Sequence, residues 1–581
     1  MKKITSTALA FLVAIGLAGC DFQAAEDAFD NFDIIIELEP INTVVNGIVT
    51  DNATGELVAA RLSFSGSGAG TVIDAYSDPL TEINAEDGVV TFGIQNSVTP
   101  SESAPVEITV TAEADGYFDE TVTVEITETG DTQFSVSLNS ENVTATAARG
   151  TAVAQDNSGS SDASGNVQQT VTVQTQQSAQ STATASVTVP QGARPLTAAG
   201  TPLTGQLTTE LKSYDSATGL QALPAKVRLG ADGSNQAVAG AAYFKLVDRA
   251  GNVAVTVQPA SSGGVASKSA GVCVGGATIT IRNSDPAQRA IYDLIVASGQ
   301  ALFFDVFAFT PADGQTNQVG TVQVEEDGAG LKADLCLGGG TGSTGVIDTG
   351  AIGNPAGGIF FSVRFQTALT SSGPLDHSVT FAGISGTKNI VLNLIGNGIN
   401  LTATKSIRNG SYKLSTLLNA GGDYRVVNNT TYTLRAVYSG SSETVDVTFA
   451  SPLTGTSSLT MPALSDLSTY NVVAALACPA GQQFEVQITS GSLDAVSAFY
   501  RIAGVGAPWT VLPKSAITSK EATANSIRIA GSLDLKANTQ YRFKGVLGSD
   551  AATTLATSPA AGQTFNITLS VDEVGIECVS E

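Results

Sequence analysis

Histidine is almost absent, because His377 is the only one in 581 residues. It stands in the tetrapeptide Leu-Asp-His-Ser, between Asp376 and Ser378. Neighbouring residues on a strand point to opposite faces, so these three cannot form a hydrolase triad, and we expect His377 at the surface. The sequence also lacks a G-x-S-x-G elbow, a phosphate-binding loop and a zinc-type cluster. It therefore predicts no catalytic residue and no enzyme.

Tryptophan also occurs once, as Trp509. A glycosidase needs only two carboxylates, so the shortage of histidine does not exclude one. Acidic pairs occur at Glu325-Glu326 and Asp572-Glu573, and we interpret both as solvated turns. A single tryptophan is a poor basis for a sugar-binding platform, and we expect Trp509 in a core.

Basic residues are scarce, with 28 Lys and Arg against 53 Asp and Glu and a net charge of −25. This balance argues against nucleic acid as a partner and against a polybasic grip on anionic lipid. Acidic turns at Asp51–Gly55, Asp248–Asn252 and Glu325–Gly330 could bind Ca²⁺, but none matches the calcium-loop pattern. We interpret them as plain turns and predict no cofactor and no metal site, with Ca²⁺ as a weak alternative.

Long hydrophobic runs are missing too. After Met1-Lys2-Lys3, the mostly apolar segment Ile4–Leu17 is too short to span a bilayer and has the layout of a secretory signal. The run ends in Leu17-Ala18-Gly19-Cys20, which resembles the bacterial lipobox. That resemblance implies cleavage before Cys20 and acylation of its thiol and amine. Two or three acyl chains hold a protein stably on a membrane.

The expected location is thus the bacterial cell envelope, with the membrane contacted through the lipid. An outer-membrane position, on the periplasmic or surface face, is favoured. Asp21 resembles the inner-membrane retention signal of enteric lipoproteins, so the periplasmic face of the inner membrane stays open.

Alternation of apolar and polar residues is abundant in the chain. In Val106–Thr127, apolar residues recur at every second position on both sides of Asp115-Gly116. This period is typical of strands with one wet face. Short strands with frequent turn signals predict an all-β fold of tandem β-sandwich domains, Ig-like or transthyretin-like, joined by flexible linkers.

Composition shifts suggest the boundaries. We predict the following segments: signal peptide 1–20, acidic tether 21–40, β-sandwich 41–140, polar linker or hairpin 141–182, β-sandwich with a disulfide 183–337, Gly-rich linker 338–358, β-sandwich 359–470, and β-sandwich with a disulfide 471–581.

Two segments resemble known modules. Gly47-x-Val49-x-Asp51-x-x-Thr54-Gly55, with the later Asp-Gly-Tyr at 115–117, resembles the carboxypeptidase regulatory-like, transthyretin-like domain. The usual central strand of that family is only loosely matched by 85–94. Members are accessory seven-stranded sandwiches without catalytic residues of their own.

Near the end of the chain, Leu533–Gly548 resembles the tyrosine corner of fibronectin type III or immunoglobulin-like domains, with Leu535 and Tyr541 at the matching positions. The resemblance implies that Tyr541 buries its ring and bonds its hydroxyl to nearby backbone. A fainter copy occurs at Asn428–Gly440.

Four cysteines remain beyond Cys20, and secretion makes disulfides the default. Three pairings are possible. Cys273 and Cys478 each precede an alternating strand, whereas Cys336 and Cys578 each follow an acidic turn at a domain's end. We therefore predict the pairs Cys273–Cys336 and Cys478–Cys578, and with them a weak repeat of the second module in the fourth.

Three functions remain open from the sequence. The leading hypothesis is a non-enzymatic, lipid-anchored envelope protein that presents β-sandwich modules for binding, adhesion or scaffolding, with an envelope protein or glycan as its unidentified partner. The others are a self-assembling surface-layer or filament subunit, and a polysaccharide-binding or polysaccharide-processing accessory lipoprotein. The step from sandwich fold to adhesion is an analogy, because such folds host many functions.

Overall fold

The computed structural model describes residues 41–74, 77–141, 150–177, 181, 183–215, 219–230, 233–259, 267–269, 272–274, 276–311, 314–328, 330–337, 344–439, 441, 443–463, 467–478, 480, 482–484, 496–503, 509–512, 516–523, 526–547, 550–560, 563–570 and 578–580. Strands account for 59% of the structure and helices for 8%, so the all-β prediction is confirmed. The strands form four modules, each with its own apolar core.

The N-terminal sandwich packs a five-stranded sheet on a four-stranded sheet. Its first and last long strands, β1 and β9, pair in parallel, with Thr43 opposite Gly130. The strands predicted within 106–127 are present as β6 and β8, which pair antiparallel with Val106 opposite Ile126. The sheets are β3 (Val72–Ile73), β5 (Val89–Ile94), β1 (Thr43–Asp51), β9 (Gly130–Ser140), β7 (Tyr117–Phe118), and β4 (Glu82–Ala85), β2 (Ala60–Ser65), β6 (Val106–Glu113), β8 (Glu120–Ile126).

The two sequence segments that carry the transthyretin-like resemblance meet in this sandwich. Asp51 Oδ1 accepts hydrogen bonds from the backbone of Ala53 (2.8 Å) and Thr54 (2.7 Å), which closes the turn after β1. Tyr117 donates its hydroxyl to Asp51 Oδ2 at 3.0 Å. One carboxylate therefore fixes two loops that are far apart in sequence.

The ten-strand module follows. Its sheet runs in the order β10 (Thr151–Ser161), β14 (Gly205–Tyr214), β15 (Val238–Asp248), β23 (Ile359–Phe365), β20 (Phe303–Thr310), β21 (Gln315–Asp327), β22 (Gly330–Leu337), β19 (Ala277–Asn283), β12 (Thr184–Val189), β11 (Val171–Gln174). Two further pairs accompany it, β13 (Arg194–Leu196) with β16 (Thr256–Gln258), and β17 (Ser267–Ser269) with β18 (Val272–Val274). Both ends of the long sheet contribute to one core.

This module corrects three predicted boundaries. Residues 141–182, expected as a polar linker, supply β10 and β11. Val171 and Val173 of β11 are buried in the core of the module although their neighbours in sequence are polar. The Gly-rich segment 338–358 is not a free joint over its described part, because Ile347 is 0% exposed in the same core. Strand β23, expected in the third sandwich, pairs with β15 and β20 instead.

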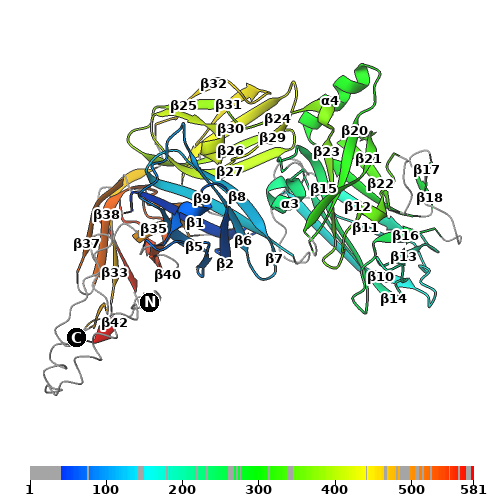
Figure 1. The fold of residues 1–581 in the computed structure, drawn as a ribbon, viewed down its shortest axis with the longest axis horizontal. Helices are drawn as coiled ribbons and strands as arrows, with labels where there is room; N and C mark the ends of the chain where they lie inside the picture. Colours follow the sequence, from blue (N-terminus) through cyan, green and yellow to red (C-terminus); the bar gives the residue numbers. More distant parts are fainter. Residues whose placement is uncertain are drawn as a thin grey trace, which may run out of the picture.

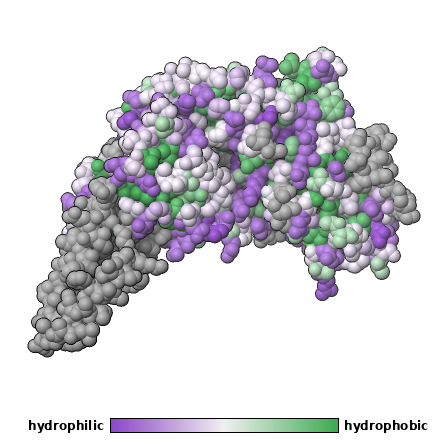
Figure 2. Space-filling model, in the orientation of Figure 1, coloured by the Kyte–Doolittle hydropathy of each residue, from purple (hydrophilic) through white to green (hydrophobic). Residues whose placement is uncertain are grey.

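Helices are few in the described residues, and the longest is α4 (Pro286–Ala297), capped by the carboxylate of Asp285, which accepts from Ala287 N. Leu294 and Val296 on its outer side are 70% and 45% exposed, and Figure 2 shows an apolar area at the upper right, where α4 lies. The others are short: η1 (Ala69–Thr71), η2 (Gly219–Ala222), α3 (Ala225–Arg228), η3 (Thr349–Ala351), η4 (Thr367–Leu369), α5 (Leu414–Leu418).

The third sandwich again pairs its first and last long strands in parallel, with Ser378 in β25 opposite Thr456 in β32. Its sheets are β28 (Gly410–Lys413), β25 (Ser378–Ala382), β32 (Thr456–Thr460); β27 (Ile399–Ile407), β26 (Lys388–Gly396), β30 (Thr431–Tyr438), β31 (Thr444–Ala450); and the pair β24 (Thr370–Gly373), β29 (Tyr424–Val427).

The fourth sandwich has the same first-to-last parallel pairing, with Val472 in β33 opposite Phe565 in β41. Its sheets are β37 (Ile517–Ala522), β38 (Ser526–Leu535), β33 (Ser468–Ala477), β41 (Phe565–Ser570); β36 (Thr510–Val511), β35 (Val496–Ile502), β39 (Gln540–Leu547), β40 (Asp550–Thr557); and the pair β34 (Gln482–Phe484), β42 (Cys578–Ser580).

Both of these sandwiches contain a tyrosine corner. Tyr541 is 2% exposed and its hydroxyl accepts from Lys536 N at 2.8 Å, as predicted. In the third sandwich Tyr432 is 0% exposed and accepts from Val427 N at 2.9 Å. In each case a tyrosine hydroxyl fixes the backbone five residues upstream.

The four modules do not form a string. Figure 1 shows the N-terminal sandwich in the middle, with the ten-strand module to its right, the third sandwich above and the fourth to its left. Side-chain hydrogen bonds join the N-terminal sandwich to each of the others, from Ala225 N to Glu120, from Gln133 to Ser406 and from Arg501 to Glu56. The modules are therefore packed around the first one, which differs from the expected chain of modules on flexible linkers.

Candidate functional site

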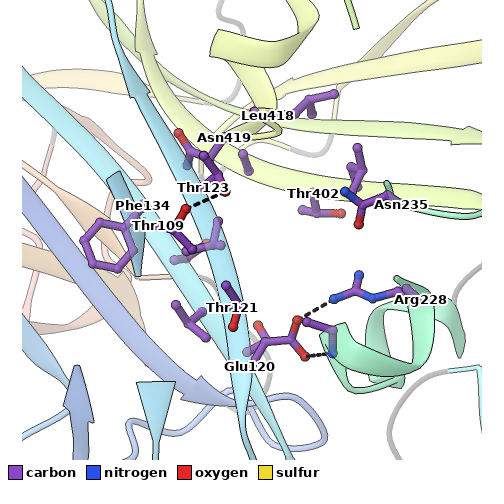
Figure 3. A pocket seen from close by; sticks show the side chains of 18 of the residues that line it. Thr109, Glu120, Thr121, Thr123, Phe134, Arg228, Asn235, Thr402, Leu418 and Asn419 are labelled. Atoms are coloured by element: carbon purple, nitrogen blue, oxygen red, sulfur yellow. Dashed lines mark hydrogen bonds and ion pairs between the residues drawn. The ribbon is translucent and has the colours of Figure 1, made fainter. Parts of the chain in front are cut away.

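A cleft of about 500 Å³ lies where the four modules meet. We call it the junction cleft. The N-terminal sandwich supplies one wall from β8 and β9, the third sandwich supplies the opposite wall from β27 and the loop after α5, and the 225–235 segment of the ten-strand module closes one end. The fourth sandwich contributes Trp509. Figure 3 shows these walls facing one another.

The N-terminal wall presents hydroxyls because alternate residues of its strands point outward. Thr109 on β6 and Thr123 on β8 lie opposite each other, with their oxygens 3.3 Å apart. Thr50 and Ser137 form a matching pair at 3.3 Å. The wall is therefore uncharged over most of its length and alternates hydroxyls with apolar side chains such as Val122 and Phe134.

The third-sandwich wall presents amides and hydroxyls. Asn400, Thr402 and Thr404 alternate along β27. Two hydrogen bonds hold this wall against the N-terminal sandwich: Gln133 donates to Ser406 Oγ at 2.9 Å, and Asn419 Nδ2 donates to the Gln133 carbonyl at 3.1 Å. Asn419 has a φ of 50°, a left-handed conformation that asparagine tolerates better than most residues. Its side chain thus acts as a bracket between two modules.

The closed end of the cleft holds an ion pair between Glu120 and Arg228 (Figure 3). Glu120 is 7% exposed and also accepts from Ala225 N at 3.1 Å. Burial raises the pKa of the Glu120 carboxyl to about 7, against the lowering effect of the Arg228 guanidinium. Buried Arg364 holds the same segment in place by donating to the carbonyls of Val227 (2.7 Å) and Leu229 (3.0 Å).

Three buried polar atoms of the lining have no hydrogen-bond partner: Arg228 Nε, Asn419 Oδ1 and Trp509 Nε1. Asn419 and Trp509 are 6% and 4% exposed. An unsatisfied buried donor or acceptor costs about 1–3 kcal/mol, so native proteins keep few of them. The cleft is the strongest candidate for a binding site because of its volume and because all four modules contribute to its lining.

Trp509 is buried, as expected, but not in the main core of its own sandwich. It packs with Phe499 and Val511 of the fourth sandwich against Ile48 and Val89 of the N-terminal sandwich. The Arg501 guanidinium lies 5.0 Å from its ring centroid. The sequence did not show that this residue lies at a joint between modules.

The predicted modification sites are only partly visible. Cys20 lies outside the described residues, and so do the side chains of Cys273 and Cys578, whose backbones belong to β18 and β42. Cys336, which is 1% exposed, and Cys478 each take part in a disulfide bond. The pairings Cys273–Cys336 and Cys478–Cys578 stay predictions.

His377 is not at the surface, which corrects the prediction. It is 4% exposed and stacks on Phe449, with ring centroids 4.3 Å apart. Nδ1 lies 2.9 Å from the carbonyl oxygen of Thr454, and Nε2 lies 2.8 Å from Ser457 Oγ. Thr454 and Ser457 flank the start of β32, so the ring joins the entry of β25 to that strand. His377 lines none of the three cavities that we describe in this protein.

The acidic candidates are engaged in structural contacts. Glu325 pairs with Lys332 at 3.2 Å and Glu326 with Arg289 at 2.6 Å, at the end of β21. Asp572-Glu573 lies outside the described residues. Asp248 Oδ1 accepts from Ala250 N at 2.9 Å within its turn. Among the described residues no group of three or more His, Cys, Asp or Glu side chains could share a metal ion.

Comparisons with known proteins give no name. No protein-family model matches the chain, and no curated protein matches it. Among solved structures, a leucine-rich repeat protein from Bacteroides thetaiotaomicron is similar over 35% of this chain and 27% of that one, at 14% identity and a TM-score of 0.14. A score this low carries no argument. Within the part of the chain that the structure describes, no helix has the length and apolar content needed to cross a bilayer.

Proposed function

We propose that this chain is a lipid-anchored cell-envelope protein without enzymatic activity that presents a fixed cluster of β-sandwich modules as a binding scaffold. The observation that supports it most is the central place of the N-terminal sandwich. This module follows the lipobox and the acidic tether directly, and it contacts the three other modules (Figure 1). A lipid on Cys20 would therefore anchor the whole cluster through its central module, the N-terminal sandwich.

The joints favour a fixed arrangement over a flexible one. Phe118 of the N-terminal sandwich packs edge-on against Phe360 of the ten-strand module, with centroids 5.1 Å apart. Ser497 of the fourth sandwich donates to Asn46 at 2.6 Å, and both are buried. Buried apolar and polar contacts of this kind resist relative motion of modules better than exposed ion pairs do. A scaffold of this kind presents its loops and clefts in constant positions.

Metabolic labelling with radioactive palmitate tests the anchor. The wild-type chain is expected to carry label and to sediment with membranes, whereas Cys20→Ser is expected to lose both. Asp21→Asn is the matched control, since it keeps the acceptor cysteine and alters only the next residue. An unlabelled wild-type chain in the soluble fraction would overturn the proposal.

A further inference from the structure

We propose that the junction cleft binds a neutral carbohydrate, because hydroxyl and amide side chains line both of its walls and its two charged lining residues pair with each other. The inference rests on the proposed binding function and names the class of ligand. It concerns a site between modules, so it depends on the packed arrangement and not on any single sandwich.

The volume and the charge of the cleft limit the class of ligand that it can bind. A volume of about 500 Å³ falls in the usual range of small-molecule sites and suits a short oligosaccharide. The charged residues that line the cleft, Glu120 and Arg228, neutralise each other. The chain as a whole carries a net charge of −25, which repels anionic ligands. A neutral ligand is therefore favoured over an acidic one.

The wall chemistry matches sugar hydroxyls. A threonine or serine hydroxyl can donate and accept, and asparagine and glutamine amides can do both through separate atoms. A sugar hydroxyl has the same double capacity. The exposed lining hydroxyls, such as that of Thr402, can therefore exchange hydrogen bonds with a sugar in either direction.

A peptide is the competing ligand, because β8 is the edge strand of its sheet and an edge can accept an added strand. That edge is already occupied in part, since Thr123 pairs with Ala420 of the third sandwich in a parallel bridge. A peptide strand would have to displace this contact. The polar groups along both walls are mostly side-chain hydroxyls and amides, which favours a ligand that bonds to side chains over one that adds a strand.

Because the chain has a single tryptophan, its fluorescence provides an assay for sugar binding. The full lipidated chain is solubilised in a zwitterionic, sugar-free detergent, and Trp509 emission is followed during titration with maltohexaose, cellohexaose, mannohexaose, chitohexaose and xylohexaose. We expect a saturable change with at least one of these neutral probes and none with oligogalacturonate. No saturable change with any neutral probe would overturn the inference, and so would binding of a random peptide library with none of the sugars.

Two matched pairs of variants test the place of binding. Asn419→Gly removes a lining amide without straining its left-handed backbone, and we expect at least a tenfold loss of affinity. Asn397→Gly is the control: this residue is also buried, with positive φ and an unpartnered Oδ1, but it does not line the cleft. It is expected to change affinity less than twofold.

The second pair covers the case in which Asn419→Gly fails to fold. Thr402→Val removes an exposed lining hydroxyl that accepts a hydrogen bond from Asn393, and we expect a three- to tenfold loss of affinity. Thr172→Val is its control, an exposed strand threonine whose hydroxyl bonds to that of Thr188. Equal losses of affinity for the two variants of either pair would contradict binding in the junction cleft. If the chain is lipidated but binds no sugar, only the carbohydrate inference is wrong. If it binds sugar but carries no lipid, only the anchoring proposal is wrong.

Discussion

The third and fourth sandwiches are built alike and closed differently. Each pairs its first and last long strands in parallel, and each fixes a loop with a buried tyrosine hydroxyl. The third sandwich has no cysteine and uses His377 to join β25 to the start of β32. The fourth sandwich has Cys478 directly after β33 and Cys578 near the end of the chain. If Cys478 pairs with Cys578 as predicted, the fourth sandwich has a covalent clamp where the third has a polar one.

They also dock differently on the N-terminal sandwich. The third combines neutral groups, such as Gln133 with Ser406, with an exposed ion pair between Arg408 and Glu128. The fourth uses charges beside an apolar cluster, with Arg501 donating to Glu56 at 2.7 Å and to the Gly55 carbonyl at 2.8 Å. The joint to the ten-strand module is charged as well, but buried, through Glu120 and Arg228. These differences predict distinct responses to reduction, pH and salt.

The largest effect is expected at the covalent clamp. If Cys478 pairs with Cys578 as predicted, Cys478→Ala should lower the free energy of unfolding of the fourth sandwich by roughly 4 kcal/mol on the chain-entropy argument. Guanidinium unfolding followed by Trp509 emission measures this. Reduced wild type is expected to match the variant. An unchanged unfolding midpoint would contradict the pairing.

The buried joint should respond to pH. Burial raises the Glu120 pKa from 4.5 to about 7, so the folded chain binds this proton more tightly than the unfolded chain does. The resulting stabilisation is full below about pH 4.5 and is lost as pH rises through about 7. The free energy of unfolding of wild type relative to Glu120→Gln should therefore fall by about 3 kcal/mol between pH 4 and pH 8. Parallel pH profiles of the two proteins would count against it.

The polar clamp is expected to contribute less than the covalent one. His377→Phe keeps a ring to stack on Phe449 but loses both hydrogen bonds, which leaves the Thr454 carbonyl and Ser457 without this partner. We expect a loss of roughly 2 kcal/mol in the stability of the third sandwich. Hydrogen exchange of β25 and β32 measures it. Faster exchange in the fourth sandwich instead would show that the clamp acts elsewhere.

Docking of the fourth sandwich should weaken when its charge pair is broken. Glu56→Gln removes the carboxylate partner of Arg501, whose side chain is 1% exposed. Because Glu56 itself is 46% exposed, we expect a modest loss of about 1 kcal/mol. Trp509 emission should shift as its cluster opens, and wild type should approach the variant at high salt. Gln133→Glu at the joint of the third sandwich, where Gln133 bonds to the uncharged Ser406, serves as the comparison.

The smallest losses of stability are expected at the two tyrosine corners, and they should be equal. Tyr432→Phe and Tyr541→Phe each leave one backbone N–H without its hydroxyl acceptor, so each should destabilise its own sandwich by about 1 kcal/mol. Tyr412→Phe is the control, since its half-buried ring bonds locally to Arg408. A large difference between the two corner variants would mean that the corners are not equivalent.

Much of the local structure could be read from the sequence. The alternation of 106–127 predicted the strands β6 and β8, and the pattern around Tyr541 predicted a buried ring bonded to backbone. Both depend on contacts between residues close in sequence. The linker prediction for 141–182 was wrong because the polar composition outweighed the alternation of Val171 and Val173. The surface prediction for His377 was wrong because its hydrogen-bond partners lie about 80 residues away in sequence.

The sequence by itself determined the strand content, the tyrosine corners and the acidic balance, since side-chain alternation, turn residues and charge act locally. Only the tertiary structure decided that β23 joins the ten-strand sheet, that Trp509 lies between two modules, and that the walls of the junction cleft face each other. Such placements depend on which surfaces bury one another across hundreds of residues, and an alternating pattern does not encode its partner. The candidate site lies in that second category, because no single module contains it.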